Sequence, residues 1–265
     1  MWPPRWTLNG ETATLEAIAS LAGNNYGHFT ALQARAGLIQ AWPLHLARLQ
    51  AATRELFGKE LAAEPLRAWL HDALRGQDAA VRISVFSRAF DRDRPSRAAT
   101  PDVLIALHPP RVRSTGPLRV CSVVHQREAP HIKHLGSFGL FNQRRLAQQR
   151  GFDDALFLGV DGCVSEGTTW NLGFHDGERI VWPAAPMLDG ISMQLLKEGL
   201  ARLGVPQMTR PLRLSDLRGM RSAFFTNAAC ACMPLACIDD LVFEADAETV
   251  DLLRAALATT PWQDP

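Results

Sequence analysis

Lysine occurs only three times in this sequence, at Lys59, Lys133 and Lys197. Lys59 lies in a charged turn, and Lys197 lies beside Glu198 in a predicted surface helix. Lys133 alone stands between apolar residues, where a strand pattern gives way to a kink and then to a helix. A lysine shielded from water has a lowered pKa, and its neutral amine can attack a carbonyl carbon. A single lysine is more often a snorkelling surface residue, so this hypothesis depends on partners elsewhere.

A carboxylate and a guanidinium could serve such a lysine. Glu166 follows a short predicted strand and precedes small and hydroxyl residues, so its side chain could face a cleft. Arg48 lies in a predicted helix and could bind a phosphate with two parallel hydrogen bonds. Taken alone, the first is more commonly a solvated turn residue and the second a helix-surface arginine.

Two further segments could bind an anion. Ile191 and Ser192 stand at a predicted helix start, where free N–H groups and a hydroxyl favour negative charge. Thr226 and Asn227 end a predicted strand and could hold a second edge of a phosphate. A plain N-cap is the commoner interpretation of the first segment.

Together these groups match what pyridoxal phosphate requires. A lysine forms a Schiff base with its aldehyde, and a carboxylate keeps the ring nitrogen protonated so that the ring accepts electrons. A cup of N–H groups, hydroxyls and one arginine holds the phosphate. The combination predicts pyridoxal 5'-phosphate as the cofactor, although no single residue does.

The elements that must position these residues indicate a mixed α/β (α+β) fold. Asn9-Gly10 and Ala36-Gly37 each separate two extended segments and predict hairpins. Pro43 predicts the start of a helix that ends at Gly58, and Ser192 is expected to cap a later helix. The sequence has no regular strand–helix alternation, no GxGxxG motif and no P-loop.

The tract from Pro109 to Pro117 is the best candidate for a linker. We therefore expect a small N-terminal domain over residues 1–110, a linker over 111–117 and a larger domain over 118–265. In the larger domain, Asp161-Gly162 predicts a hairpin turn and Asp246 an N-cap of the last helix.

Composition excludes several classes of protein. The formal net charge of +1 gives no electrostatic reason to expect a nucleic acid or an anionic membrane as partner. No apolar run is long enough to cross a bilayer, and the N-terminus lacks the apolar core of a signal peptide. The five cysteines are Cys121, Cys163, Cys230, Cys232 and Cys237. Their spacing fits neither a disulfide framework nor a metal site. We therefore expect buried free thiols, no metal and a cytoplasmic location.

On these residues the chain resembles the class IV pyridoxal-phosphate enzymes of fold type IV. That family includes branched-chain and D-amino acid aminotransferases and aminodeoxychorismate lyase. His45–Leu49 resembles its H-x-x-R-L helix, and Ile132–Leu135 resembles its lysine segment, most closely that of the lyase branch. Asp161–Leu172 resembles its most specific motif, while Gly190–Ser192 and Thr226–Ala228 match its two phosphate loops.

The resemblance implies a small N-terminal α/β domain and a larger C-terminal, barrel-like mixed-sheet domain that binds the cofactor. It implies that Lys133 is catalytic and that Glu166 contacts the pyridine nitrogen. It also implies a homodimer and a small-molecule amino substrate. The residues expected to bind the cofactor are Arg48, Lys133, Glu166, Ile191, Ser192, Thr226 and Asn227.

The chain departs from the family pattern in ways that leave the substrate open. Gly136 and Phe138 stand where members usually have an asparagine and often a tyrosine, and Tyr26 is the sole tyrosine. Arg88 and Arg127 are candidates for binding a substrate carboxylate, with surface salt bridges as the alternative. Three functions follow: transamination, elimination of the aminodeoxychorismate lyase type with release of pyruvate, or cofactor binding without turnover.

Overall fold

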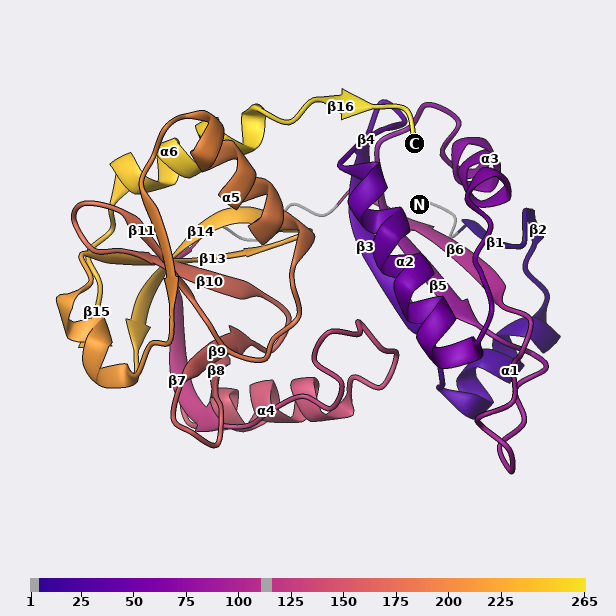
Figure 1. Ribbon diagram of the computed structural model, residues 1–265, viewed down its shortest axis with the longest axis horizontal. Coiled ribbons are helices and arrows are strands. Elements are labelled where there is room, and N and C mark those ends of the chain that lie inside the picture. Colours follow the sequence, from indigo (N-terminus) through magenta and orange to yellow (C-terminus); the bar gives the residue numbers. More distant parts are fainter. Residues whose placement is uncertain (1–4, 111–115) are drawn as a thin grey trace. The chain divides into compact units, whose positions relative to one another are not determined.

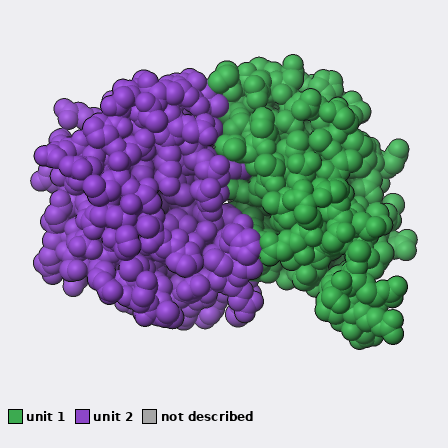
Figure 2. All heavy atoms as spheres, in the orientation of Figure 1, with its two compact units in different colours: residues 1–112, 132–136, 261–265 green, residues 113–131, 137–260 purple. Residues whose placement is uncertain are grey.

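The computed structural model describes residues 5–110 and 116–265. The chain divides into two compact units, which Figure 2 colours separately. The first comprises residues 5–110, Ile132–Gly136 and Pro261–Pro265, and the second comprises residues 116–131 and Ser137–Thr260. Of the expected linker 111–117, residues 111–115 lie outside the described residues.

Two segments expected in the larger domain therefore pack with the first unit. The backbone of Lys133 accepts a hydrogen bond from Phe29 N (2.9 Å), and Leu135 N donates one to Gly27 O (2.9 Å). Residues Trp262–Gln263 form an antiparallel pair with Leu38–Gln40. Such backbone pairing between distant residues is not visible in a linear sequence pattern, which is why a boundary drawn from composition misses both segments.

The first unit is an antiparallel sheet with helices packed on it (Figure 1). Among the described residues its sheet has seven strands in the order β16-β4-β3-β5-β6-β1-β2. The elements are β1 (Arg5–Leu8), β2 (Glu11–Thr12), α1 (Leu15–Asn24), β3 (His28–Arg35), β4 (Leu38–Gln40), α2 (Trp42–Phe57), α3 (Ala63–Leu74), β5 (Ala79–Phe86), β6 (Asp102–His108) and β16 (Trp262–Gln263).

Alternation along the strands separates the two faces of this sheet. Leu32 on β3 and Ile83 on β5 belong to one buried cluster with Trp42 and Leu49 of α2 and Leu70 of α3. Each large apolar side chain buried there stabilises the unit by about 1.5–3 kcal/mol. The opposite face carries Phe29 and Arg82, so these two side chains lie away from this core.

The second unit is a mixed sheet that curls around its own core (Figure 1). Among the described residues the strands follow the order β12-β11-β10-β13-β14-β7-β8-β9, with β15 paired to β14. The elements are β7 (Leu118–Val124), α4 (Phe138–Gln149), β8 (Asp154–Leu158), β9 (Val164–Gly167), β10 (Asn171–His175), β11 (Ile180–Pro183), α5 (Ile191–Arg202), β12 (Gln207–Arg210), the 3-10 helix η1 (Leu214–Gly219), β13 (Ser222–Asn227), β14 (Cys230–Ile238), β15 (Leu241–Val242) and α6 (Ala247–Ala258).

Side chains from opposite parts of this curl meet inside it. Val164 of β9, Leu172 of β10 and Phe225 of β13 share one buried cluster. A second cluster joins Trp182 of β11 and Leu196 of α5 to the sheet. The expected mixed α/β architecture with a barrel-like larger part is confirmed.

Most local predictions agree with these elements. Asn9-Gly10 and Ala36-Gly37 form tight turns with positive φ at all four residues, as the two-residue hairpins require. The Asp246 carboxylate caps α6 by accepting from Thr249 N at 3.1 Å. All five cysteines are free and buried.

One helix start was predicted wrongly. The helix α5 begins at Ile191, and its N-cap is Gly190 rather than Ser192. The serine lies inside the first turn, because the helix begins two residues earlier than a Ser192 cap would require. Of the helices within residues 5–110 and 116–265, none has the length and apolarity needed to cross a membrane.

Candidate active site

The segment around Lys133 is held by backbone pairing to the start of β3. Besides the two hydrogen bonds given above, His134 forms an isolated antiparallel bridge with His28. Ile132 and Leu135 are buried on either side of the half-buried lysine. The Lys133 Nζ atom lies 5.0 Å from the centroid of the Phe29 ring. Lys133 is therefore placed by the main chain, and its amine lies against an aromatic face.

Arg82, on β5, contacts the same aromatic ring and was missed by sequence reasoning. Its Cζ lies 3.5 Å from the Phe29 ring centroid, and its Nε donates to Ser84 Oγ at 3.3 Å. Burial lowers the pKa of the Arg82 guanidinium, and no carboxylate of the described residues forms an ion pair with it. A desolvated cation without an acidic partner attracts an anionic ligand. The only signal in the sequence was the period-two pattern of β5, in which Arg82 alternates with the apolar residues Val81 and Ile83.

Arg48 lies on α2, which buried histidines fix to the sheet. His45 Nδ1 and Thr30 Oγ1 form a 2.7 Å hydrogen bond, and His28 Nε2 and Thr53 Oγ1 form one of 3.0 Å. Burial and then the charge of Arg48 lower the pKa of His45 to about 3, and burial lowers that of His28 to about 4. Both rings are therefore neutral at physiological pH and serve as hydrogen-bonding groups between helix and sheet.

Arg88, predicted as a carboxylate-binding residue, already has a carboxylate partner. Its Nη2 donates to Asp102 Oδ1 at 2.9 Å, and its backbone N donates to Asp102 Oδ2 at 2.9 Å. Asn9 Nδ2 adds a third hydrogen bond to this carboxyl group at 2.9 Å. Arg88 and Asp102 line a shallow hollow with Ala89 and Thr100. The ion pair favours a structural role for Arg88, since it joins the two ends of the loop between β5 and β6.

In the second unit, Glu166 lies on β9 and is buried, so the interpretation as a solvated turn residue is wrong. Its Oε1 accepts a hydrogen bond from Leu188 N at 3.3 Å and lies 3.7 Å from Arg127 Nη1. Both charged side chains are only 6% exposed. Arg127, the other predicted carboxylate-binding residue, thus lies beside the glutamate, where its charge favours the ionised carboxylate.

The start of α5 offers unused backbone amides. Gly190 provides no side-chain cap, and the first N–H groups of a helix have no acceptor within it. A Cβ atom at Gly190 would lie 1.9 Å from Asn171 Oδ1, so only glycine allows this approach. The amides of Ile191 and Ser192 therefore remain at the positive end of the helix dipole.

Thr226 and Asn227 lie at a bulge where β13 turns into β14. The Thr226 side chain is fully buried, and its Oγ1 has no hydrogen-bond partner among the described residues. A buried hydroxyl without a protein partner costs free energy, and it can donate a hydrogen bond to a bound ligand. Asn227 is engaged instead: its Oδ1 accepts from Ala229 N (2.9 Å) and Cys230 N (2.8 Å), which shapes the turn.

These parts of the second unit are joined to one another. Thr226 pairs with Asn171 across the β10–β13 ladder, and Asn171 Nδ2 donates to Leu188 O at 2.8 Å. Leu188 N in turn contacts Glu166. The arrangement fits pyridoxal phosphate, because a phosphate would accept hydrogen bonds from the Thr226 hydroxyl and the α5 amides, and a carboxylate would meet the ring nitrogen.

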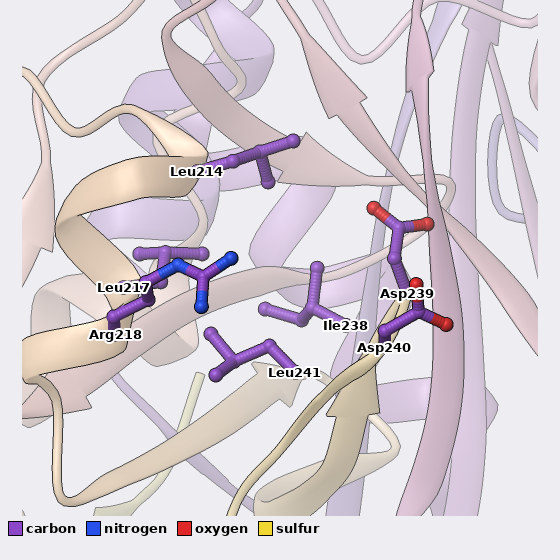
Figure 3. A pocket seen from close by; sticks show the side chains of 7 residues that line it. All are labelled: Leu214, Leu217, Arg218, Ile238, Asp239, Asp240 and Leu241. Atoms are coloured by element: carbon purple, nitrogen blue, oxygen red, sulfur yellow. The ribbon is translucent and has the colours of Figure 1, made fainter.

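A separate hollow in the second unit contains none of the predicted site residues. Figure 3 shows its lining, which comes from η1 and from the β14–β15 turn. Among the described residues, no group of three or more His, Cys, Asp or Glu side chains could hold a metal ion.

Comparison with known proteins identifies relatives. Residues 27–238 match the family model of the class IV aminotransferases. A probable branched-chain-amino-acid aminotransferase of Synechocystis sp. is 29% identical over 122 residues, which cover 45% of this chain and 40% of that protein. The match thus spans well under two thirds of the curated relative.

Solved structures share the fold over most of the chain. The branched-chain aminotransferase of Thermoproteus uzoniensis superposes with a TM-score of 0.85 at 19% identity, covering 96% of this chain and 94% of the other. A putative 4-amino-4-deoxychorismate lyase of Legionella pneumophila gives 0.79 at 18% identity, covering 88% and 90%.

Proposed function

We propose, since the chain belongs to the class IV aminotransferase family, that it catalyses pyridoxal-phosphate-dependent transamination of an amino acid or another amino-bearing carboxylate. The observation that carries the proposal is the anion cup of the second unit. It combines the partnerless, buried Thr226 hydroxyl with the uncapped start of α5. Such a cup on a chain of this family suits the phosphate of the cofactor.

When bound, pyridoxal phosphate supplies an aldehyde that links covalently to amines and a ring that withdraws electrons from the substrate's α-carbon. We propose that Lys133 Nζ would accept the α-proton of the substrate and later give it back, so that no net proton is consumed. Glu166 would hold a proton on the ring nitrogen, with the Arg127 guanidinium 3.7 Å from its carboxylate. The amides of Ile191 and Ser192 and the Thr226 hydroxyl bind the phosphate.

Arg48 is proposed to add a guanidinium to the phosphate, as the family resemblance implies. Its place on α2 is fixed by His45, which lies one turn earlier and is bonded to Thr30. We propose that Asn227 contributes to phosphate binding through its backbone and through the turn that its side chain shapes.

For the substrate carboxylate we propose Arg82 in preference to Arg88. The Arg82 guanidinium is desolvated, lacks an acidic partner among the described residues and lies on the same ring as Lys133. Arg88 is 51% exposed and already neutralised by Asp102. A charge-assisted hydrogen bond contributes about 1.5–3 kcal/mol, so Arg82→Met should raise KM for the amino acid about 10- to 100-fold. Arg88→Met should stay within about twofold by the same reasoning, and the reverse order would reject this assignment.

Borohydride reduction followed by peptide mapping tests the cofactor chemistry. The wild-type protein should carry one pyridoxyl group, on Lys133, and the Lys133→Ala variant should carry none. A pyridoxyl group on Lys59 or Lys197, or no group at all, would refute the proposal.

Elimination of the aminodeoxychorismate lyase type is the alternative function. Two features favour it: the lyase-like segment Ile132–Leu135 and Phe138 in place of the tyrosine found in many aminotransferases. An amino donor should convert the bound cofactor to its amine form if the enzyme transaminates. Release of pyruvate without that conversion would identify a lyase, and a yellow protein that reacts with no amino acid would identify binding without turnover.

We also propose a homodimer in the cytoplasm, as expected from the family resemblance. Five free, buried thiols suit a reducing compartment. Sedimentation analysis of the purified protein tests the dimer, and a monomer at micromolar concentration would contradict it.

A further inference from the structure

A buried charge cluster contacts the motif Asp161–Leu172, which contains Glu166. Asp154, at the start of β8, is fully buried and accepts four hydrogen bonds. Its Oδ1 accepts from Ala155 N (2.9 Å) and Thr168 Oγ1 (2.7 Å). Its Oδ2 accepts from Arg144 Nη2 (2.8 Å) and Trp170 Nε1 (2.9 Å). The four acceptor positions of the carboxylate are thus all used, as a buried charge requires.

Arg144 joins α4 to the turn between β9 and β10. Its Nη2 lies 2.8 Å from Asp154 Oδ2, 2.6 Å from Thr168 Oγ1 and 2.7 Å from Thr169 Oγ1. Nη2 has two hydrogens for these three acceptors, so at least one hydrogen is shared. Both threonine hydroxyls of the motif are therefore bonded to the cluster.

The turn held in this way connects Glu166 to the Thr226 side of the anion cup. It begins directly after Glu166 and is closed by a hydrogen bond from Gly167 N to Trp170 O (2.8 Å). A Cβ atom at Gly167 would lie 2.0 Å from the Trp170 ring, so the indole packs directly on the turn. Thr169 O accepts from Asn227 Nδ2 at 3.3 Å, which extends the connection to the turn after Thr226.

We infer that Arg144 and Asp154 are positioning residues, which fix Glu166 and the Thr226 turn in the geometry that the cofactor needs. The inference rests on the proposed function for the identity of the ligand. Neither residue has to touch the cofactor, because each acts through the β9–β10 turn. Loss of the Arg144 contacts should misplace the carboxylate of Glu166 and the phosphate-binding hydroxyl together.

The test compares Arg144→Met with Arg144→Lys and with the matched control Arg145→Met. Arg145 is the next residue on α4, and its described side-chain hydrogen bonds go only to Asn142 of the same helix. The dissociation constant of pyridoxal phosphate is measured with the apo protein, and the visible absorbance of the bound cofactor is titrated against pH. Arg144→Met should bind about 10- to 100-fold more weakly, with a displaced absorbance titration. Arg145→Met should match the wild type, and Arg144→Lys should recover part of the loss.

A purely structural role would give a different result. It would lower the unfolding temperature of Arg144→Met but leave the cofactor affinity and the absorbance titration of the folded protein unchanged, and this outcome would overturn the inference. If Arg144→Met does not fold, Thr169→Val removes a single acceptor and should still weaken binding severalfold. Unchanged binding in that variant counts against the inference. If the wild-type protein itself binds no pyridoxal phosphate, the proposed function fails first.

Discussion

The segments that carry Lys133 and Glu166 are held in opposite ways. Lys133 lies outside regular structure, and backbone hydrogen bonds to Gly27 and Phe29 fix it. Glu166 lies on a buried strand, and the turn that follows it is fixed by side chains, those of Arg144 and Asp154. The lysine therefore depends on the path of the main chain, and the glutamate on the identity of particular side chains.

This difference predicts where each half is vulnerable. Main-chain pairing tolerates changes of neighbouring side chains but not a change in the backbone conformation that permits it. A side-chain network tolerates small backbone shifts but fails when one charged partner is removed. The three predictions below test this contrast in order of decreasing effect.

Gly27→Ala should be the most damaging change to the lysine segment. Gly27 has φ +150°, and a Cβ atom there would lie 2.3 Å from Val85 O and 3.0 Å from Leu135 Cδ1. Strain and steric clash together should cost about 3–5 kcal/mol of unfolding free energy and displace the lysine. Chemical denaturation and borohydride labelling measure both effects. Gly76→Ala is the control, because Gly76 also has positive φ (+72°) but nothing within 4 Å of a new Cβ. Equal losses of unfolding free energy in both variants would show that close packing at Gly27 does not hold the lysine segment.

Acid should weaken the first unit through its buried histidines. The pKa of His28 is about 4 and that of His45 about 3 when folded, against 6.5 in an unfolded chain. The unfolded chain thus binds more protons below pH 6.5, so stability is complete above that pH and falls as pH drops toward 4 and 3. Each histidine should cost roughly 2 kcal/mol of unfolding free energy between pH 7 and pH 5.

Urea unfolding at the two pH values measures this loss. His45→Gln should remove about half of the difference between pH 7 and pH 5 that the two histidines cause. His71→Gln should leave the difference unchanged, since that ring is exposed and stands at the end of α3. If the His45 and His71 variants lost the same unfolding free energy between pH 7 and pH 5, buried His45 would not be a source of the acid sensitivity.

Thr226→Val should have the smallest effect on stability, and it should stabilise the protein. The hydroxyl is buried without a partner among the described residues, so an isosteric methyl group should stabilise the apo protein by up to about 1 kcal/mol. The same change should weaken pyridoxal phosphate binding about tenfold, because one phosphate hydrogen bond is lost. Thermal unfolding and a cofactor titration check the two effects. A variant that is less stable yet binds normally would show that the hydroxyl serves the fold instead.

Sequence patterns predicted features that depend on neighbouring residues. The Asn9-Gly10 turn and the Asp246 cap are set by local backbone preferences, and both are present. Pro234 concealed the central strand β14, because proline is rare in such strands. The helix α1 was not predicted, although Thr14 caps it with a side-chain hydrogen bond.

The site was predictable where a motif is continuous and not where contacts join distant residues. Lys133 and Glu166 each belong to a recognisable motif. Arg82 reaches the Phe29 ring only because β3 pairs with β5, although the two residues are 53 positions apart in the sequence. Arg144 likewise meets Thr169 only after α4 packs on its sheet. Neither partnership follows from residue type or local spacing.

The strand β16 has a consequence for how the protein is made. It pairs with β4 at one edge of the first sheet, and Arg35 Cζ lies 4.6 Å from the centroid of the Trp262 ring. A ribosome releases β4 long before it reaches Trp262, so the nascent chain carries an unpaired sheet edge while the whole second unit is synthesised. Such an edge can pair with other chains. The first unit is begun first but completed last, and its protection against wrong pairing arrives only with the residues that follow α6.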